Sequence, residues 1–275
     1  MTIAREAGAL LRIEVREVLP LYGGDLSSVH RLIMADGNSL VAKQSPVAGI
    51  EADMIDAIRA TGAPAPAVLA RRHDLFVMEW IDANDSLAMA WDDLAAVVHK
   101  LHAAPSPQTV ESRGDAPYGW PGDYAFGPVA IPGGSYRAWP EFWSEQRLLC
   151  HLAHVPTDIA ARLERLCAGL GNLLPKTPRP ALLHGDLWGG NVMVSAKRVA
   201  GLIDPACCHG DPVVDLAMLT LFDHPPPQFF TALTLEAGWR ERLPVYSLWP
   251  LLVHLRLFGE GYRRAVGNAL ARVGY

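Results

Sequence analysis

The sequence predicts an α+β protein with two unequal lobes, a small β-rich N-lobe at residues 1–81 and a larger, mainly helical C-lobe at residues 82–275. The first observation is that short apolar runs separated by glycine turns fill roughly the first eighty residues, a pattern typical of antiparallel hairpins. The second is that apolar side chains recur at helical spacing through most of the chain after Ile81. The third is the length of 275 residues, which is enough for about two domains.

The N-lobe is predicted to be an antiparallel sheet with one helix. Its predicted strands are apolar runs at residues 15–21, 29–34, 39–42, 68–70 and 75–80. The dipeptide Asp36-Gly37 favours a tight turn between the second and third of them. The helix is predicted over residues 49–61, because Ile50, Met54 and Ile58 recur at helical spacing and a glycine follows.

The C-lobe is predicted to be a set of amphipathic helices with a short hairpin. The predicted helices cover residues 86–101, 139–152, 159–174, 213–222, 228–237 and 246–266. The predicted strands cover residues 181–183, 192–194 and 199–203, and a turn at residues 195–198 joins the last two. Residues 104–134 are rich in glycine, proline and aromatic residues with little periodicity, so we expect a packed irregular loop.

Composition and charge exclude several classes of function. Lys and Arg total 24 against 29 Asp and Glu, a formal net charge of −5 with no basic block, which argues against nucleic-acid binding. No apolar stretch approaches the roughly 20 residues that cross a bilayer, and charges near the N-terminus interrupt any signal peptide. Four cysteines without regular spacing are typical of reduced thiols. We therefore expect a cytoplasmic protein that binds neither a membrane nor a nucleic acid, and the oligomeric state stays open.

The densest polar cluster is His-Gly-Asp-Leu-Trp-Gly-Gly-Asn at residues 184–191, in a loop just before the predicted hairpin. Asp204 follows that hairpin, thirteen residues after Asn191. Phosphoryl transfer from a nucleotide needs a base aimed at the acceptor hydroxyl, oxygen ligands for magnesium and a cation on the phosphates. Asp186 is suited to be the base, and Asn191 and Asp204 offer the hard oxygen ligands that Mg²⁺ prefers.

The N-lobe supplies a candidate for the cation. Lys43 ends a predicted strand, and Glu51 lies eight residues later beside the apolar stripe of the predicted helix. A strand lysine held by a helix glutamate is how kinase-like folds orient a cation on the α- and β-phosphates. Each residue alone is also typical of a solvated surface charge. Their placement together with the aspartates and the asparagine indicates a nucleotide site.

Two further segments are candidates for nucleotide contact. Gly23 and Gly24, with Ser27, could cover the phosphates with backbone N–H groups and a hydroxyl, although the segment is not a G-x-G-x-x-G and is also typical of a plain hairpin turn. Met78, Glu79 and Trp80 lie at the lobe boundary, where an exposed backbone edge could form hydrogen bonds with adenine. The same residues are also typical of a buried edge strand.

Two residues near the catalytic motif are interpreted as structural. His184 is predicted to brace the backbone of the loop. Asp215 begins a predicted helix, where a carboxylate can accept hydrogen bonds from N–H groups and brace the same loop.

These residues resemble those of the fructosamine (ketosamine) kinases, a family of the protein-kinase-like superfamily that also includes aminoglycoside and choline kinases. The motifs that carry the resemblance are residues 184–191, Leu-Ile-Asp-Pro-Ala at 202–206, and Gly210-Asp211 through Asp215-Leu216-Ala217-Met218. The resemblance extends from about Gly23 to Arg264 and implies a protein-kinase-like bilobal fold.

The resemblance also implies an activity, ATP-dependent phosphorylation of the C3 hydroxyl in the sugar part of a ketosamine. Products of this kind release the amine, so the family is regarded as deglycating. On the matching positions, Asp186 would be the base, Asn191 and Asp204 the Mg²⁺ ligands, and Lys43 with Glu51 the holder of the phosphates. Trp188 matches a tryptophan near the acceptor. The implied partner is a small-molecule ketosamine or a glycated amine or protein.

The chain departs from the family pattern where a Gln and an Asn are common. Gly133 and Ser135 stand there, and the segment before Trp139 is about two residues shorter. If that loop borders the acceptor, its change leaves phosphoryl transfer intact but alters which amine or sugar is accepted.

Three alternatives stay open at this stage. One is a kinase of another hydroxyl compound, such as an aminoglycoside or choline, although residues 246–264 contain more arginine than acid. The second is a non-catalytic, nucleotide-binding pseudokinase. The third is a dinuclear metallohydrolase, whose ligands would be His184, Asp186, Asp204, His209 and Asp211.

Overall fold

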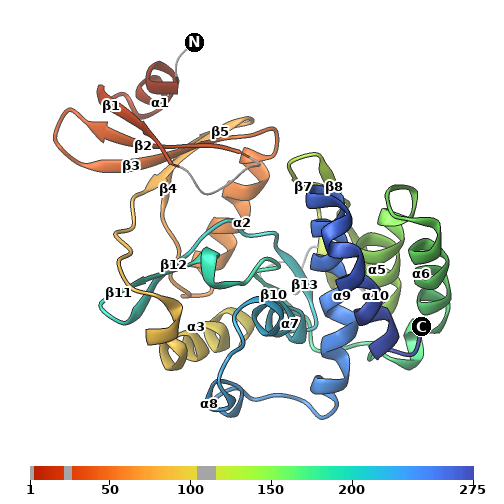
Figure 1. The fold of residues 1–275 in the computed structure, drawn as a ribbon. Helices are drawn as coiled ribbons and strands as arrows, with labels where there is room; N and C mark the ends of the chain where they lie inside the picture. The colour runs from red at the N-terminus through yellow and green to blue at the C-terminus, as the bar shows by residue number, and fades with distance from the viewer. Residues whose placement is uncertain (1–2, 22–26, 104–115) are drawn as a thin grey trace.

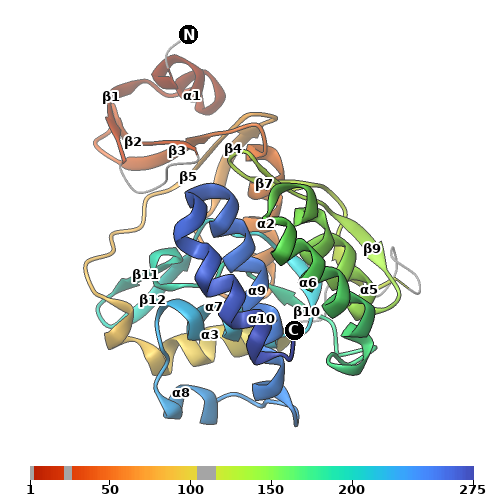
Figure 2. The same ribbon diagram turned by 45° about the vertical axis from the view of Figure 1, so that its right-hand side comes forward.

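The computed structural model describes residues 3–21, 27–103 and 116–275 (Figures 1 and 2). Among these residues a β-rich part comes first and a mainly helical part follows, which confirms the predicted α+β fold class. The N-terminal sheet ends at Glu79 and the next helical turn starts at Leu87, so residue 81 falls in the connection between them. That residues 1–81 and 82–275 are separate domains stays a prediction. No helix in the described part of the chain is long and apolar enough to span a membrane.

The N-lobe is built on a five-stranded antiparallel sheet in the order β1-β2-β3-β5-β4. Its strands are β1 (Val15–Pro20), β2 (Ser28–Met34), β3 (Ser39–Gln44), β4 (Val68–Arg72) and β5 (Leu75–Glu79). Side chains of β5 alternate between two hydrophobic clusters, Leu75 and Val77 in one, Phe76 and Met78 in the other. The sheet is therefore covered on both faces.

Two helices cover these faces, whereas we expected one. Helix α2 (Ala48–Ala60) lies on the face toward the C-lobe, close to its predicted range. Helix α1 (Ile3–Leu11) packs on the opposite face, with Ala7 buried, and was not predicted. A nine-residue helix is marginal by itself. Packing on the sheet, which the local sequence does not reveal, stabilises it.

The C-lobe contains helices of very different lengths. Those described include η1 (Leu87–Met89), α3 (Trp91–Ala103), α5 (Trp139–Trp143), α6 (Thr157–Gly169), η4 (Leu170–Asn172), η5 (Gly189–Asn191), α7 (Val213–Phe222), α8 (Pro227–Thr231), α9 (Trp239–Phe258), η6 (Gly259–Tyr262) and α10 (Arg263–Arg272). Helix α5 continues as a π-turn, η2 (Ser144–Leu148), and a 3₁₀ segment, η3 (Leu149–His154), across the predicted range 139–152. Helices α9 and α10 lie side by side in both views (Figures 1 and 2).

Two predictions for the end of the chain are wrong in their bounds. The predicted helix at 246–266 is two helices, because α9 begins at Trp239 and ends where Gly259 adopts a φ of 77°. The predicted helix at 228–237 is the shorter α8. Pro244 and Pro250 inside α9 hid its true length from the sequence pattern, since proline usually ends a helix.

The predicted irregular loop at 104–134 is also partly wrong. Its described part contains strands of three residues each, β6 (Tyr118–Trp120), β7 (Tyr124–Phe126), β8 (Val129–Ile131) and β9 (Gly134–Tyr136). Strands β6 and β9 join β10 (Ala181–Leu183) and β13 (Cys208–Gly210) in a sheet of order β10-β13-β6-β9. Strands this short give only a weak alternating signal, which the surrounding glycines and prolines obscure.

The two lobes share one hydrophobic core. Met54, Ile55 and Ile58 of α2 are fully or almost fully buried and belong to the same cluster as the C-lobe helices. The N–H of Leu202, which ends the hairpin of β11 (Val192–Ser195) and β12 (Arg198–Leu202), donates to the Pro64 carbonyl at 2.9 Å. Helix α2 is thereby fixed against the segments that carry the polar motifs.

Candidate active site

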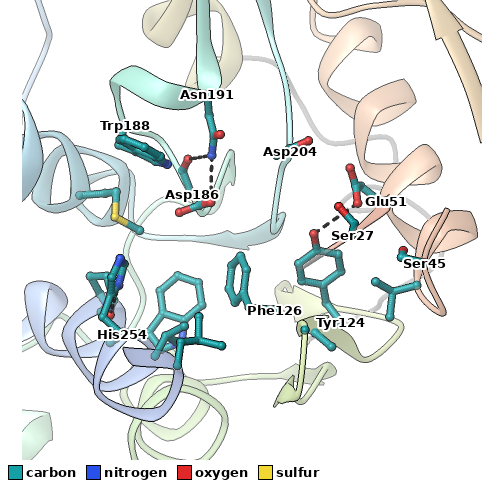
Figure 3. A pocket seen from close by; sticks show the side chains of 18 of the residues that line it. Ser27, Ser45, Glu51, Tyr124, Phe126, Asp186, Trp188, Asn191, Asp204 and His254 are labelled. Carbon is teal, nitrogen blue, oxygen red and sulfur yellow. Dashed lines mark hydrogen bonds between the residues drawn. The ribbon is translucent and has the colours of Figure 1, made fainter. Parts of the chain in front are cut away.

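A cleft of about 510 Å³ lies between β3 and α2 on one side and helices α7 and α9 on the other (Figure 3). Seven of the predicted site residues line it, namely Ser27, Lys43, Glu51, Asp186, Trp188, Asn191 and Asp204. The fold thus brings together residues far apart in the chain, such as Lys43 and Asp204, which are separated by 161 positions. Gly23 and Gly24 lie outside the described residues.

Lys43, Glu51 and Asp204 form the charged end of the cleft. Lys43 Nζ donates to Glu51 Oε1 at 2.6 Å and to Asp204 Oδ1 at 2.8 Å, although Lys43 and Glu51 are only 4% and 1% exposed. Burial alone would lower the pKa of the Lys43 ammonium, but the charges of Glu51 and Asp204 outweigh burial and raise it. Burial raises the pKa of Glu51 to about 7, against the opposing pull of Lys43. Because an ammonium has three N–H donors, one is left for a ligand.

Asp186 and Asn191 meet in the middle of the cleft. Asn191 Nδ2 donates to Asp186 Oδ2 at 2.9 Å and to the Asp186 carbonyl at 2.8 Å. These bonds orient the asparagine, and its amide oxygen lies on the side toward Asp204 (Figure 3). Burial in the cleft raises the pKa of Asp186 to about 7, while the Asn191 hydrogen bond opposes the rise. A carboxylate with a pKa near neutrality is suited to accept and return a proton.

Asp215 holds the loop that carries Asp186 in place through hydrogen bonds to its backbone. Asp215 is fully buried and accepts the N–H of His184 through Oδ2 and that of Gly185 through Oδ1, both at 2.9 Å, and His102 Nε2 lies 2.9 Å from its Oδ2. Burial would raise the pKa of Asp215, but these partners lower it, so the carboxylate stays charged. The predicted bracing role of Asp215 is confirmed.

His184 also braces the loop, as predicted. Its ring is fully buried, with Nε2 3.0 Å from the Ile203 carbonyl and Nδ1 accepting the Asp186 N–H at 3.3 Å. Burial lowers the pKa of His184, so the ring is neutral and Nε2 carries its proton. His184 therefore connects the catalytic loop to the strand end before Asp204.

Two residues at the cleft, Gly185 and Asp204, have a left-handed backbone conformation. Gly185 has a φ of 80°, and a Cβ there would lie 2.0 Å from the Ala206 carbonyl oxygen, so only glycine fits. Asp204 has a φ of 53°, uncommon for a residue with a side chain. Such strain persists where the surroundings hold it in place, and here it aims the carboxylate at Lys43.

Met78, Glu79 and Trp80 do not line the cleft. Strand β5 is flanked by β3 and β4, and the Glu79 N–H already donates to the Ala67 carbonyl at 3.0 Å. Trp80 donates from Nε1 to Asp82 Oδ1 at 2.6 Å, and the Arg31 guanidinium lies 4.2 Å from its ring centre. Their predicted contact with adenine stays a prediction.

The aromatic end of the cleft is lined by Trp188, Phe222, His254, Phe258 and Tyr262. Trp188 and His254 lie on the other side of Asp186 from Glu51 and Asp204 (Figure 3). Phe222, on α7, has its ring centre 6.2 Å from that of Trp188 and 5.2 Å from that of His254. Phe258 and Tyr262 lie 5.4 Å and 4.9 Å from His254. Of this group only Trp188 was a predicted site residue.

The hairpin of β7 and β8 also lines the cleft, although none of its residues was predicted to lie at the site. Tyr124 is buried and its hydroxyl lies 3.5 Å from Glu51 Oε2, and Phe126 follows at the hairpin tip. The signal was present: Gly127-Pro128 is a turn dipeptide between two alternating runs, Tyr-Ala-Phe and Val-Ala-Ile. The prolines and glycines on either side obscured it.

The unusual Gly133 and Ser135 do not line the cleft. The Gly133 N–H donates to Asp123 Oδ1 at 2.8 Å, and Ser135 pairs with Gly119 in the β6–β9 ladder. A Cβ on Gly133 would lie 2.4 Å from the Gly122 carbonyl oxygen, so this position needs a glycine for close packing.

The described part of the chain does not bring the ligands of the metallohydrolase alternative together. Within residues 3–21, 27–103 and 116–275, no three His, Cys, Asp or Glu side chains gather where they could hold a metal ion. Asp211 instead accepts from the Tyr246 hydroxyl at 2.7 Å and pairs with Arg242 at 3.0 Å. The cleft thus holds a carboxylate, a buried cation and two further side chains with oxygen atoms, which are the groups that phosphoryl transfer requires.

Comparison with known proteins agrees with this chemistry. A family model described as fructosamine kinase matches residues 20–273. A protein named as a probable ketoamine kinase of Escherichia coli K12 is 31% identical over 281 residues, covering 95% of this chain and 93% of that protein.

Solved structures give the same relationship. A crystal structure described as a candidate fructosamine-3-kinase of Thermobifida fusca has a TM-score of 0.85 and 28% identity, covering 99% of this chain and 98% of that one. An aminoglycoside phosphotransferase in complex with ADP and hygromycin B has a TM-score of 0.66 at 18% identity, covering 99% and 97%. The second likeness shows the fold alone, and it confirms the protein-kinase-like architecture that the sequence predicted.

Proposed function

Because the chain belongs to the fructosamine kinase family and is an ATP-dependent phosphotransferase that acts on a hydroxyl group of a small molecule, we propose that its acceptor is a ketosamine, phosphorylated at the C3 hydroxyl of the sugar. The product then releases its amine, so the reaction removes sugar from glycated amines. The proposal includes free and protein-bound ketosamines as acceptors and a cytoplasmic location.

The observation that carries the proposal is the position of Asp186. Its carboxylate lies between the charged end and the aromatic end of one cleft, and Asn191 fixes it by a 2.9 Å hydrogen bond (Figure 3). A hydroxyl bound between the two ends would meet a base on one side and a phosphate on the other. That juxtaposition is what in-line transfer to an alcohol requires.

Asp186 accepts the proton of the acceptor hydroxyl while the oxygen of that hydroxyl attacks the γ-phosphorus of ATP. The bond from that phosphorus to the β,γ-bridging oxygen breaks, and ADP leaves with the electron pair. The pKa of about 7 for Asp186 lets it take the proton at neutral pH and give it up afterwards.

Lys43 neutralises the phosphates. Two of its donors are held by Glu51 and Asp204, which aims the third at a ligand in the cleft. A preorganised cation in a partly buried site stabilises developing charge without the cost of reorienting water. The backbone of Gly23 and Gly24 and the hydroxyl of Ser27 are proposed to cover the same phosphates, and Met78, Glu79 and Trp80 to border adenine.

Mg²⁺ fits the oxygen atoms that remain. The Asn191 amide oxygen is directed toward the Asp204 side by the two hydrogen bonds of its nitrogen, and the Asp204 side chain is 40% exposed to the cleft. Mg²⁺ is commonly held by one or two protein oxygens together with substrate phosphates. When bound, it would supply charge neutralisation of those phosphates.

The test is incubation with Mg-ATP and a panel of ketosamines that differ in sugar length, followed by the rate of ADP formation. We expect ADP release that depends on a ketosamine, and we expect none with Asp186→Asn. Transfer to an aminoglycoside or choline, without transfer to any ketosamine, would contradict the proposed acceptor while leaving the kinase activity in place.

A further inference from the structure

The aromatic end of the cleft offers a ligand a continuous uncharged wall. From Trp188 through Phe222 and His254 to Phe258 and Tyr262, neighbouring ring centres are 4.9–6.2 Å apart. These rings come from the catalytic loop, α7, α9 and η6, so four elements converge to build it.

Part of this wall has no protein cover. Trp188 is 41% exposed and Phe258 is 52% exposed, and both belong to the small set of exposed large hydrophobic residues in the described chain. Scattered exposed hydrophobic residues are ordinary, but here two of them face one concave cleft. Covering such a surface with an apolar ligand removes it from water, which makes the free energy of binding more favourable.

His254 adds a polar atom without adding charge. Its Nδ1 lies 2.7 Å from the Pro250 carbonyl, and since a carbonyl only accepts, Nδ1 must be the donor. Burial lowers the pKa of His254, which keeps the ring neutral. Its Nε2 therefore presents a lone pair, suited to accept a hydrogen bond from a hydroxyl or an N–H.

Charged side chains on the same elements are engaged elsewhere. Arg256 lies 3.1 Å from His151 Nδ1, and Arg263 pairs with Glu260 and Asp158 at 3.3 Å and 2.9 Å. None of these residues lines the cleft. Asp223, next to Phe222, accepts the Gly189 N–H at 2.8 Å. Among the described residues that line this end of the cleft, none beyond Asp186 offers a carboxylate to a ligand ammonium, and none offers a cation to a ligand carboxylate. Burying an unpaired charge is costly.

We propose that the acceptor is a ketosamine whose amine carries an apolar, uncharged substituent, and that this substituent lies against the rings of Phe222, Phe258 and Tyr262. The inference rests on the proposed function and extends it to the amine part of the substrate. In this arrangement the sugar lies near Trp188 and Asp186, and the substituent points away from the nucleotide.

An isosteric pair of acceptors tests this inference. The fructose ketosamines of hexylamine and of 1,5-diaminopentane differ only in a terminal methyl against a terminal ammonium. We expect the hexylamine derivative to have a kcat/KM at least about tenfold higher, the discrimination that an apolar pocket commonly provides. Values within twofold of each other, or a preference for the ammonium, would overturn the inference and leave the proposed function standing.

Two variants locate the preference. Phe258→Ala removes an exposed ring of the wall, and the ratio of the two kcat/KM values is expected to fall toward one. Leu69→Ala is the matched control, since Leu69 is 47% exposed on β4 and does not line the cleft, and its ratio should equal that of the wild type. An unchanged ratio in Phe258→Ala overturns the inference. Failure of the wild type to phosphorylate either ketosamine overturns both the proposed function and the inference.

Discussion

The charged end and the aromatic end of the cleft lie on either side of Asp186 and are built in different ways (Figure 3). At the charged end, direct contacts at 2.6 Å and 2.8 Å hold a buried lysine between two carboxylates. At the aromatic end, rings pack at tilted angles with exposed surface remaining. The first arrangement tolerates little change because ion pairs need exact partners. At the aromatic end, exchanging one side chain can change which acceptor binds, so one phosphotransfer site can serve different acceptors.

The largest expected effect is loss of the base between the two ends. Asp186→Asn keeps the shape but cannot accept a proton, so kcat should fall about 10³-fold. Steady-state ADP release measures it, with Asp36→Asn, in an exposed turn, as the control. A decrease of less than about tenfold would remove Asp186 from the base role.

The next effect concerns the charged end. Lys43→Met should lower kcat/KM for ATP about 10²-fold, because a preorganised cation on the phosphates is lost. The exposed Lys197→Met serves as the control. If Lys43→Met changed only the KM of the acceptor, the division of the cleft into two ends would be wrong.

The third prediction concerns protein stability and tests how Asp215 holds the loop that carries Asp186. Asp215→Asn should cost about 2–3 kcal/mol of unfolding free energy at pH 7, since a buried carboxylate that accepts two N–H groups is lost. The folded pKa of Asp215 is lowered, so its stabilising contribution is complete above the unfolded pKa of about 3.9 and is lost as the pH falls through the folded value. Urea unfolding should therefore show the gap between wild type and variant closing in acid.

The exposed Asp158→Asn provides the comparison, since Asp158 pairs with Arg263 at the surface. Its unfolding free energy should differ from wild type by less than about 1 kcal/mol at any pH. A gap for Asp215→Asn that stays constant down to pH 3 would contradict the charged state of Asp215.

At the aromatic end a smaller effect is expected. Trp188→Ala should raise the KM of the acceptor about tenfold, the loss of one stacked ring face, and should change the KM of ATP much less. Initial rates with each substrate varied in turn separate the two constants. Equal increases in both would mean that Trp188 does not distinguish the acceptor from the nucleotide.

The smallest effect is expected where the β7–β8 hairpin touches the charged end. Tyr124→Phe removes a hydroxyl 3.5 Å from Glu51, a long contact, so kcat should change by less than about threefold. A decrease of more than about 30-fold would show that the hairpin positions the Lys43–Glu51 pair more strongly than this distance indicates.

The charged end and the Asp186–Asn191 pair beside it could be predicted from the sequence because their residues stand in short motifs whose chemistry is explicit. Asp186 and Asn191 are five residues apart, and Lys43 and Glu51 are eight residues apart on adjacent elements. The aromatic end could not, because Phe222, His254 and Tyr262 are single residues in apolar segments where aromatic side chains are ordinarily core. Only the packing of α7 against α9 brings their rings together.

The same reasoning applies to the fold. The N-lobe strands and α2 follow from clear alternation and helical spacing, whereas α1 depends on a sheet face that exists only after folding. The three-residue strands β6 to β9 depend on glycines that let backbones approach, such as Gly119, where a Cβ would lie 2.2 Å from the Gly134 carbonyl oxygen. Such contacts leave no period in the sequence.

We propose that this cleft transfers phosphate from ATP to a sugar hydroxyl of a ketosamine. The most direct measurement is ³¹P and ¹³C NMR of the product formed from Mg-ATP and a fructose ketosamine. We expect one phosphate, on the C3 oxygen, followed by slow release of the free amine. A phosphate at another position, or ATP consumed with no phosphate on the ketosamine, would contradict it.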